Sequence, residues 1–541
     1  MSGEEQKSFL DSRTILAIVL MVVVWFGWES YLKRKYPQPE KPLVTESAQA
    51  PAIQSGPVAG QPAATAVAPV KTGTTQPAAE TSIPFQSSEI NFEVSSAGMG
   101  LKNITLNKYF DRENRPIRIG APRDILPFQV NLRGQAEPIP FKLEKVSDTE
   151  FRGTATVSGV AIARTYKVEA SKYLIRSTTE LSGAAPGAGI TQYMSEEARP
   201  GADTVSKTLG DPIDTWLSFY VAAEKSVHEH PSPTERSEKD ISKASVATLG
   251  SRYFTMAVTE DSSVIPNFRM VSEPSRNLFY GAFEYQLLEG NQLRVNDGFF
   301  IGPRSVDTLR AADPRLEAAV DFGMFSWIAY PILDLLRWFY KLTHNYGIAI
   351  IALTILVRMI VLPFNIMSYK SMKAMQNIQP QITRLKERHK DDREALNREM
   401  MILMKENKVN PLGGCLPMLL QLPVFLALYQ VLNQTIELYR APWMLWITDL
   451  SLKDPYYVLP VLMGIVMYIQ QKMTPTTMDP AQAKVMQFMP IMFTFMMISL
   501  PSGLTLYIFV STLFGILQQL AFMRDKKPKA ASKVLSDALD V

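Results

Sequence analysis

Apolar residues gather in two separate parts of this chain, and that arrangement limits its possible folds more than any other feature. One apolar run, residues 15–28, lies near the N-terminus, and several more lie between residues 346 and 522. A helix needs about 20 consecutive apolar residues to cross the hydrocarbon core of a bilayer. The pattern therefore predicts a membrane protein whose hydrophobic segments are separated by long water-soluble ones.

The charge and cysteine content exclude several classes of function. The chain has 56 Lys and Arg against 52 Asp and Glu, a balance that gives no sign of a nucleic-acid-binding surface. Cys415 is the only cysteine, so no disulfide forms within the chain, and one thiol with four scattered histidines excludes a Cys/His zinc framework. Binding of Ca²⁺ or Mg²⁺ by carboxylates stays open. We expect no metal, no cofactor and no catalytic residue.

The first part of the chain is predicted to be an anchor followed by a tether. Residues 1–32 hold the apolar run, and no small-residue cleavage site follows it closely, so we expect a cytoplasmic tail and an uncleaved transmembrane anchor rather than a signal peptide. Residues 33–84 are rich in Pro, Ala, Thr and Gln and contain too few large apolar residues to form a core. This composition predicts a flexible linker.

The next part is predicted to be a large β domain followed by an amphipathic helix. Residues 85–315 alternate between apolar and polar side chains and are broken by Gly, Pro and Asn turns, which is typical of a β-sandwich. Residues 316–344 contain apolar positions at helical spacing, which predicts a helix lying along the membrane surface. These positions are Phe325, Ile328, Ile332, Leu335, Leu336 and Phe339. The alternative is an ordinary helix packed on the sandwich.

Residues 345–523 are predicted to form a bundle of five transmembrane helices. The predicted spans are residues 346–366, 412–432, 457–471, 485–500 and 504–522. Residues 368–410 are polar but keep apolar positions at helical spacing, which predicts an antiparallel helical hairpin joined near Asp391. Pro380 is expected to kink or shorten the first helix of the hairpin.

Basic residues predict the orientation of these segments. The hairpin contains ten Lys and Arg and the tail, residues 524–541, contains five, whereas residues 433–455 contain two. Because cytoplasmic loops carry an excess of basic residues, the hairpin and the C-terminus are predicted to be cytoplasmic. The N-terminus is then also cytoplasmic and the β domain lies outside. Three basic residues at 33–35 favour the opposite orientation of the anchor, but the excess in the hairpin and tail is larger.

Arg358 is a charged residue inside the predicted span 346–366. Placing an arginine near the centre of a bilayer costs roughly 2.5–3.5 kcal/mol on insertion scales. No Asp or Glu lies in any of the five predicted spans, so none of them offers this arginine an ion-pair partner. Either the side chain reaches the cytoplasmic interface, or it lies in a hydrated pocket that presents an unpaired cation to an acidic or polar segment of another molecule.

Polar residues in the other predicted spans favour such a pocket. Several repeat every seven residues in the last span, which places them along one side of a helix. The candidates are Thr354, Gln421, Thr505, Ser511, Thr512, Gln518 and Gln519. The alternative is hydrogen bonding between helices, which is common in membrane bundles.

Methionine and proline mark two of the predicted spans. Met486, Met489, Met492, Met496 and Met497 crowd the fourth span of the bundle. Flexible thioethers adapt to varied apolar partners, as they do at promiscuous binding surfaces. The prolines of these spans, Pro417, Pro423 and Pro490, each remove a backbone hydrogen bond and soften the helix. Ordinary packing against lipid or neighbouring helices is the alternative.

Four motifs carry a resemblance to a known family. They read NPLGGCLPMLLQLPVFLALY at 410–429, DPYYVLPVLM at 454–463, FMPIMFT at 488–494 and PSGLTLY at 501–507. These segments resemble the bacterial YidC family of membrane protein insertases. The resemblance covers residues 325–523, and the anchor, linker and β domain resemble the Gram-negative form more loosely.

The resemblance implies a non-enzymatic insertase. Its fold would be a multi-domain membrane protein, with a five-helix core, an N-terminal anchor helix, a periplasmic all-β supersandwich-like domain and a cytoplasmic helical hairpin. The core would enclose a groove open to the cytoplasm and to lipid. By position, Arg358 matches the groove arginine of the family and Thr354 its groove threonine. The residues that match the apolar faces contacting substrates are Leu422, Pro423, Phe425, Met496 and Tyr507.

The resemblance also implies partners and a location. The chain would lie in the bacterial inner membrane, and would insert and help to fold nascent membrane proteins, alone or with the Sec translocon and its accessory subunits, in contact with membrane lipids. The family's hairpin is implicated in receiving substrates and its tail in contacting the ribosome. Here the tail ends with Asp537 and Asp540, so we expect weak ribosome binding. No other nucleic-acid recognition is expected.

Two other classes of function stay open at this point. A small-solute transporter would show paired half-repeats or carboxylates within the membrane, and neither is visible in the predicted spans. A membrane-tethered carbohydrate-active protein could use His228, Glu229 and His230 of the β domain as acid and base. The sequence favours the alternative, that these three are loop residues beside Pro231 and Pro233.

Overall fold

The computed structural model describes residues 80–523, apart from 112, 121–124, 198–216, 223–224, 230–234, 263, 390–391, 408–415 and 474–479. All of these residues belong to one unit, Gln76–Val541. The predicted anchor, most of the predicted linker and the predicted tail therefore lie outside the described residues.

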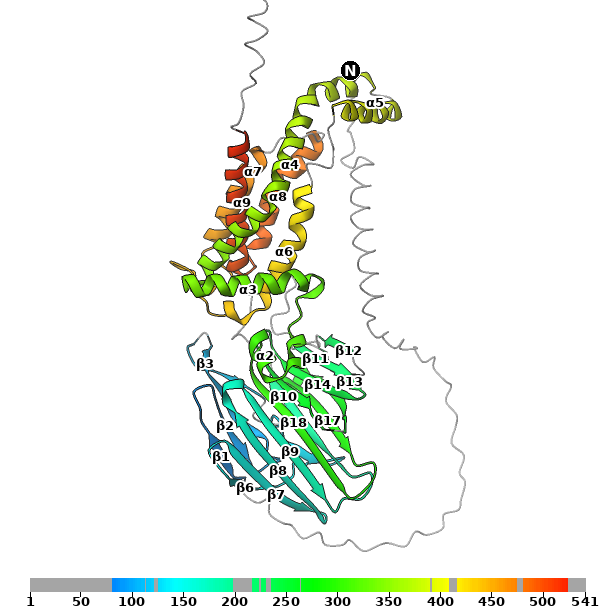
Figure 1. The fold of residues 1–541 in the computed structure, drawn as a ribbon, viewed down its shortest axis with the longest axis vertical. Coiled ribbons are helices and arrows are strands. Elements are labelled where there is room, and N and C mark those ends of the chain that lie inside the picture. The colour runs from blue at the N-terminus through cyan, green and yellow to red at the C-terminus, as the bar shows by residue number, and fades with distance from the viewer. Residues whose placement is uncertain are drawn as a thin grey trace, which may run out of the picture. The chain divides into compact units, whose positions relative to one another are not determined.

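The first part of the described chain forms three antiparallel β-sheets, as the alternation of apolar and polar residues predicts (Figure 1). The strand orders are β1-β2-β3-β4, β13-β16-β17-β10-β5 and β12-β11-β14-β15-β18-β9-β8-β7-β6. The strands and the two short 3-10 turns between them are β1 (Ser82–Phe85), β2 (Ile90–Ser95), β3 (Leu101–Phe110), β4 (Pro116–Ile119), β5 (Val130–Leu132), β6 (Lys142–Lys145), β7 (Glu150–Val157), β8 (Val160–Glu169), η1 (Ala170–Lys172), β9 (Leu174–Ser182), β10 (Gly189–Glu197), β11 (Leu217–Ala222), β12 (Lys225–Glu229), β13 (Ser237–Ile241), β14 (Ala244–Gly250), β15 (Phe254–Glu260), β16 (Asn267–Glu273), η2 (Pro274–Arg276), β17 (Leu278–Gln286) and β18 (Gln292–Pro303).

The β domain begins earlier than the sequence pattern predicts. Strand β1 pairs with β2 from Ser82, so residues 82–84 belong to a sheet rather than to the predicted linker 33–84. The strand is anchored by Phe85, whose ring stacks on Phe92 at 4.8 Å between centroids. Pro84 argues against a strand in the sequence, because proline cannot donate a backbone hydrogen bond. However, β1 lies at a sheet edge, where proline is tolerated.

The β domain encloses a polar cluster in its core. Arg164 is fully buried and donates to the carbonyl oxygens of Phe128 at 2.7 Å and Gly98 at 3.0 Å. Tyr285 donates its hydroxyl to Asp297 Oδ1 at 2.8 Å, and both residues are buried. Burial and the neighbouring Glu260 carboxyl raise the pKa of Asp297 well above its ordinary value. Folding therefore shifts this carboxyl toward its protonated form.

We expect Asp297→Asn to flatten the pH dependence of the stability of the β domain. A carboxyl whose pKa is raised by folding binds more protons in the folded state, so stability falls with rising pH between the unfolded and folded pKa values. The contribution of Asp297 to the free energy of unfolding should therefore fall as the pH rises above about 4, where the unfolded carboxyl ionises. Urea unfolding of the full-length protein in detergent, followed by proteolysis within the sheets, measures this slope.

Asp240→Asn is the control for this experiment, because the side chain of Asp240 is 72% exposed and pairs with Arg269 on the surface. That variant should keep the wild-type pH dependence of stability. A wild-type slope in Asp297→Asn as well would show that the buried carboxyl does not carry the effect.

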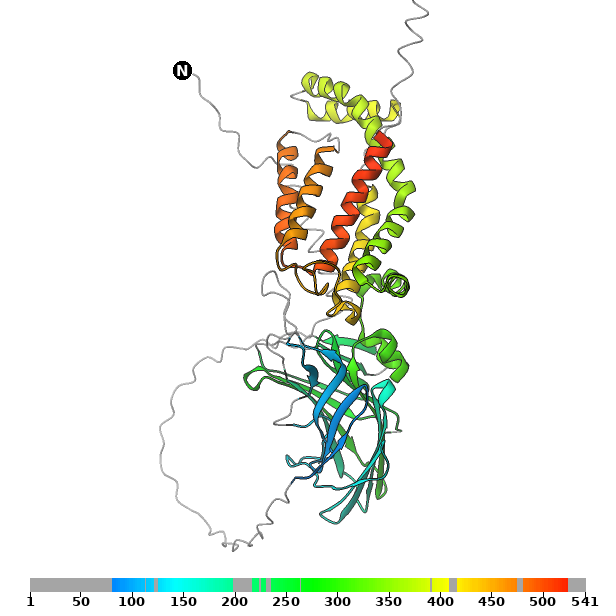
Figure 2. The ribbon, with the colours of Figure 1, turned by 90° about the vertical axis from the view of Figure 1, so that its left-hand side faces the viewer.

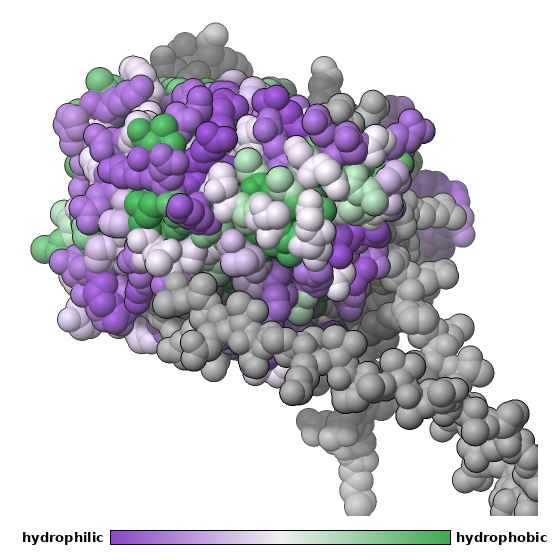
Figure 3. Space-filling model, turned by 90° about the horizontal axis from the view of Figure 1, so that it is seen from below, coloured by the Kyte–Doolittle hydropathy of each residue, from purple (hydrophilic) through white to green (hydrophobic). Residues whose placement is uncertain are grey.

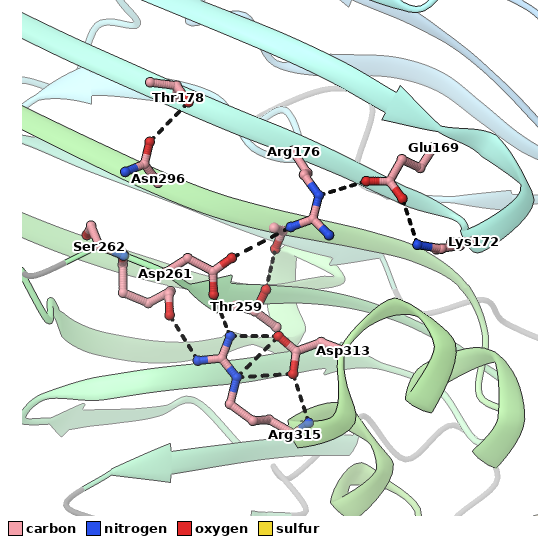
Figure 4. Close-up of polar contacts among 12 residues, drawn as sticks. Glu169, Lys172, Arg176, Thr178, Thr259, Asp261, Ser262, Asn296, Asp313 and Arg315 are labelled. Atoms are coloured by element: carbon pink, nitrogen blue, oxygen red, sulfur yellow. Dashed lines mark hydrogen bonds and ion pairs between the residues drawn. The ribbon is translucent and has the colours of Figure 1, made fainter.

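Ion pairs fix the segment that leaves the sheets (Figure 4). Arg315 pairs with Asp261 at 2.7 Å and with Asp313 at 2.6 Å. Asp261 also faces Arg176 of β9 at 3.9 Å. Each exposed pair contributes less than about 1 kcal/mol by itself. Together they join the turn after β15 to the start of the helical part.

The second part of the described chain is helical (Figure 2). Its elements are α2 (Val306–Ala312), η3 (Pro314–Ala319), η4 (Gly323–Phe325), α3 (Ser326–Thr343), α4 (Tyr346–Arg388), α5 (Arg393–Glu406), α6 (Leu416–Gln434), η6 (Ile436–Leu438), α7 (Val458–Met473), α8 (Pro480–Met497) and α9 (Ser502–Met523). Helix α3 packs against α4 and α6. It buries Ile332, Leu333 and Leu336, and it exposes Trp327 and Trp338.

Helix α4 corrects one prediction. The sequence pattern predicts a span at 346–366 and a hairpin helix that Pro380 kinks or shortens. The structure has one helix, α4, from Tyr346 to Arg388, so Pro380 does not shorten it. A proline removes one backbone hydrogen bond, which neighbouring contacts can offset. Here Ile378 and Ile382, on either side of Pro380, are buried against residues of α5.

Exposed apolar side chains divide unequally between the two parts. Among the described residues, large exposed apolar side chains number four before residue 304 and thirty-one from Met324 onward. The face drawn in Figure 3 is mostly hydrophilic, with small separate hydrophobic groups. The many exposed apolar side chains from Met324 onward indicate a surface that contacts lipid or protein. By length and composition, α4 and Ser502–Ala521 can cross a membrane, and α7 and Gln487–Met497 are apolar but shorter.

Candidate functional site

Arg358 lies on α4 and faces α9. It is half-buried, and its Nε donates to the hydroxyl oxygen of Ser511 at 2.8 Å. Gly515 of α9 lies beside it and leaves room for Gln470 of α7, because a Cβ on Gly515 would lie 2.7 Å from Gln470 Nε2. Among the described residues, no carboxylate lies within ion-pair distance of this guanidinium. Its one hydrogen-bond partner in that part of the chain is therefore a neutral hydroxyl.

The predicted threonines do not join Arg358. Thr354, Thr505 and Thr512 are buried, and each donates its hydroxyl to the backbone carbonyl four residues earlier in its own helix. Such bonds satisfy a hydroxyl without a partner from another helix. In this structure the three side chains therefore line the interior of the bundle without contributing a hydrogen bond to the arginine or to a neighbouring helix.

The glutamines connect helices instead. Gln421 of α6 donates to the hydroxyl of Tyr507 on α9 at 2.6 Å, and Tyr507 is 3% exposed. Gln519 donates to the carbonyl oxygen of Met473 at the end of α7 at 2.9 Å. Gln518 accepts from Asn365 of α4 at 3.2 Å. These contacts are hydrogen bonds between helices, which is the alternative to a hydrated pocket that the sequence analysis kept open.

Sequence reasoning missed two polar residues on the Arg358 side of α4. Asn365 is buried, and Tyr369 donates its hydroxyl to the carbonyl oxygen of Gly515 at 3.4 Å. Both lie beyond or at the end of the predicted span, which stopped at Ile366. The signal was available, because positions seven and eleven residues after Arg358 return to the same face of a helix.

The residues predicted to contact apolar substrates differ in exposure. Leu422 is 53% exposed and Met496 is 37% exposed, whereas Pro423 and Phe425 are half-buried. Tyr507 is buried against Gln421 and does not reach the surface in this structure. Helix α8, where methionines crowd the sequence, also exposes the apolar side chains of Phe488, Ile491, Met492 and Phe495.

The histidines considered for carbohydrate chemistry do not form a site in the described residues. His228 of β12 packs its ring against Phe219 at 4.9 Å between centroids. Glu229 forms an ion pair with Lys239. His230 lies outside the described residues. Ring packing therefore explains His228, and an ion pair explains Glu229.

Apolar helices with a half-buried arginine, joined to a water-facing β domain, define a membrane protein with a large extramembrane domain. Comparison with known proteins agrees. Residues 82–335 match the model of the YidC periplasmic domain family, and residues 338–530 match that of the 60Kd inner membrane protein family. The chain belongs to the YidC family of membrane protein insertases.

Individual relatives span nearly the whole chain. The protein of Geotalea daltonii named membrane protein insertase YidC is 34% identical, over 94% of this chain and 98% of its own length. The protein of the same name from Geobacter metallireducens is also 34% identical, over the same shares. A solved structure described as an active YidC insertase crystal structure with the first transmembrane domain resolved is 19% identical, covers 82% of this chain and 93% of its own, and has a TM-score of 0.38.

These matches confirm the family, the insertase function and the non-enzymatic activity that the C-terminal motifs predict. They also confirm an inner-membrane protein with a periplasmic domain, built from a sheet-rich N-terminal region and a helical C-terminal region. The substrates of an insertase are nascent membrane proteins.

Proposed function

We propose that Arg358 receives the hydrophilic flank of a nascent membrane protein within a groove between α4 and α9. The observation that carries the proposal is a guanidinium bonded only to the neutral hydroxyl of Ser511 within the described residues. A cation among apolar helices gains most from a charged or polar partner, because hydrogen bonds to ionised groups are the stronger ones. An acidic or polar flank of the substrate supplies that partner. Because the flank is drawn partway into the membrane, the distance that it must still cross is shorter.

The apolar segments of the substrate would then move into lipid along α6 and α8. Leu422 of α6 and Met496 of α8 carry this second part of the proposal, together with the exposed side chains of α8. Removing apolar surface from water supplies roughly 25 cal/mol per Å². The membrane potential adds about 2.3 kcal/mol per charge per 100 mV when an acidic tail moves outward. No nucleotide is required.

The proposed topology has six spans: the N-terminal anchor, α4, α6, α7, α8 and α9. The end of α4 and α5 would lie in the cytoplasm with both termini. Two contacts favour the opposite side for the connection between α6 and α7. The hydroxyl of Tyr439 donates to the carbonyl oxygen of Phe110, and Arg440 Nη1 donates to that of Asp111, both in the β domain.

The Sec translocon, the ribosome and membrane lipids are the further partners that we propose. The ten basic residues of the predicted hairpin, residues 368–410, support a role of this segment in receiving substrates. The tail, residues 524–541, contains Asp537 and Asp540 beside its five basic residues, and this composition favours weak ribosome binding.

Solvent access at position 358 tests the groove. Arg358→Cys is made in a Cys415→Ser background, and a membrane-impermeant thiol reagent is added from each side in turn. We expect labelling from the cytoplasmic side alone. Met401→Cys, 72% exposed on α5, controls for cytoplasmic access, and Leu288→Cys, 77% exposed in the β domain, controls for periplasmic access. No labelling at 358 in a folded protein would instead indicate a dry structural arginine.

A further inference from the structure

The connection between α6 and α7 contains a tight turn, residues 443–447, which we name the apolar turn. Ile447 N donates to the carbonyl oxygen of Met444 at 3.1 Å, and Trp443 N donates to that of Ile447 at 3.0 Å. Leu445 lies at the tip with φ +53°. A residue with a Cβ pays roughly 1–2 kcal/mol in this left-handed region, where glycine is favoured. A leucine is therefore unexpected at position 445, unless its side chain makes a contact that offsets this cost.

The apolar turn is held firmly by the helices around it. Asn345 Nδ2 donates to the carbonyl oxygen of Trp443 at 2.9 Å. The ring of Trp443 packs so tightly on Gly347 that a Cβ there would lie 2.0 Å from its Cδ1. Trp446 Nε1 donates to the buried carboxylate of Asp454 at 2.9 Å. The backbone conformation of Leu445 is therefore imposed by a rigid frame.

Two apolar side chains project from this frame. Met444 is 52% exposed and Leu445 is 77% exposed. Their neighbours Trp443 and Trp446 are half-buried, so the rigid part of the turn contacts the protein while its tip does not. Strained, exposed and apolar residues at a fixed tip indicate a surface that is covered by something outside the described residues.

The position of the apolar turn identifies what covers it. The connection lies beside the first turns of two apolar helices, because Asn345 precedes α4 and Gly503 N of α9 donates to the carbonyl oxygen of Leu450 at 2.9 Å. The gold segment between α6 and α7 lies at the α3 end of the bundle in both views (Figures 1 and 2). Contacts of Tyr439 and Arg440 with the periplasmic domain assign this end to the outer leaflet.

The aromatic residues around the tip fit the same location. Trp443 and Trp446 flank it, and Tyr456 and Tyr457 follow in the same connection, with exposed fractions of 69% and 40%. Tryptophan and tyrosine are enriched where a membrane protein passes from hydrocarbon to water, because their rings are apolar at one edge and polar at the other.

We propose that the apolar turn inserts Met444 and Leu445 into the acyl chains of the outer leaflet. The occupant of this surface is lipid, and the turn acts as a fixed wedge that sets the depth of the periplasmic ends of α4 and α9. The Gly347–Trp443 packing and the Asp454 hydrogen bonds transmit that depth to the helices. The wedge is independent of Arg358 and of the groove.

A polarity-sensitive fluorophore at position 445 tests the wedge. Leu445→Cys is made in a Cys415→Ser background, labelled with a thiol-reactive probe, and the full chain is placed in vesicles of phosphatidylethanolamine and phosphatidylglycerol. A matched set of vesicles carries lipids with a nitroxide on the acyl chain. Leu288→Cys is the matched control, because Leu288 has the same exposed fraction, 77%, on the β domain.

We expect the probe at 445 to emit at shorter wavelength than the probe at 288, to lose several-fold of its emission to the nitroxide lipids, and to resist aqueous iodide. The probe at 288 should show the reverse. Quenching by iodide at 445 as strong as at 288 would overturn the proposal. Resistance to both quenchers would also overturn it, because protein, such as residues 15–28 or a second copy, would then cover the tip.

Leu445→Gly provides a second test in a variant that should still fold. Glycine adopts φ +53° without strain, so this variant should fold at least as well as the wild type. With a probe at Met444→Cys in this background, we expect stronger iodide quenching than with Leu445 present. Unchanged quenching at 444 would count against a shared wedge.

Discussion

Replacing Arg358 with alanine should lower the insertion of substrates with acidic or polar flanks roughly tenfold or more. A hydrogen bond to a charged group is worth about 1.5–3 kcal/mol, and each 1.4 kcal/mol is a factor of ten. The variant removes the cation on the α4 face of the proposed groove and the hydrogen bond from Arg358 Nε to Ser511. Protease protection of a newly made substrate, in cells depleted of the native insertase, measures the effect.

Two controls separate charge from structure in this experiment. Arg358→Lys keeps the cation and should retain most insertion, whereas Ser511→Ala removes only a neutral partner and should change insertion little. A substrate with a short uncharged flank should depend less on Arg358. Normal insertion of acidic-flanked substrates by Arg358→Ala would remove this residue from the mechanism.

Replacing Arg337 with alanine should destabilise the protein by about 2–4 kcal/mol. Arg337 of α3 donates from Nε to Oε1 of Glu437 in η6 at 3.0 Å, and it also pairs with Asp307 of α2 at 3.0 Å. The side chains of Arg337 and Glu437 are only 16% and 12% exposed. Removing one partner of a largely buried pair leaves the other charge without compensation. Thermal unfolding of the purified protein in detergent measures the loss.

Arg294→Ala is the matched control for Arg337→Ala. Arg294 also pairs with a glutamate, Glu180 at 3.5 Å, but its side chain is 67% exposed. Its loss should cost no more than about 1 kcal/mol. The double variant Arg337→Met with Glu437→Met should recover much of the stability, because an apolar pair of similar volume needs no compensation. Equal losses for Arg337→Ala and Arg294→Ala would contradict the role of burial.

Local patterns predicted the elements well where one period dominates a segment. In β8, alternate residues Ile162, Arg164, Tyr166 and Val168 are buried, as a period of two requires. The pattern does not predict that the buried set includes an arginine. Arg164 is tolerated there because carbonyl oxygens from distant segments, Gly98 and Phe128, meet its guanidinium.

Element boundaries depended on contacts that the sequence does not display. Strand β1 exists because β2 offers it a partner, and α4 continues through Pro380 because α5 packs on both sides of that residue. In each case a residue with poor local propensity is retained by tertiary packing, which routinely overrides propensity. Tyr369 was missed because the predicted span ended at Ile366, although the helical period places it on the same face of α4 as Arg358.

The sequence by itself determined the family, the membrane character, the β-rich and helical parts, and the presence of an arginine without an acidic partner in the predicted spans. These properties are encoded in motifs, in periodicity and in composition, all of which are local. Only the tertiary structure decided which partner each polar group takes. Arg358 meets Ser511, 153 residues away in the chain, while Thr354, Thr505 and Thr512 bond to their own helices and Tyr507 is buried by Gln421. Those outcomes depend on the rotation and spacing of packed helices, because a shift of one residue moves a side chain by about 100° around its helix.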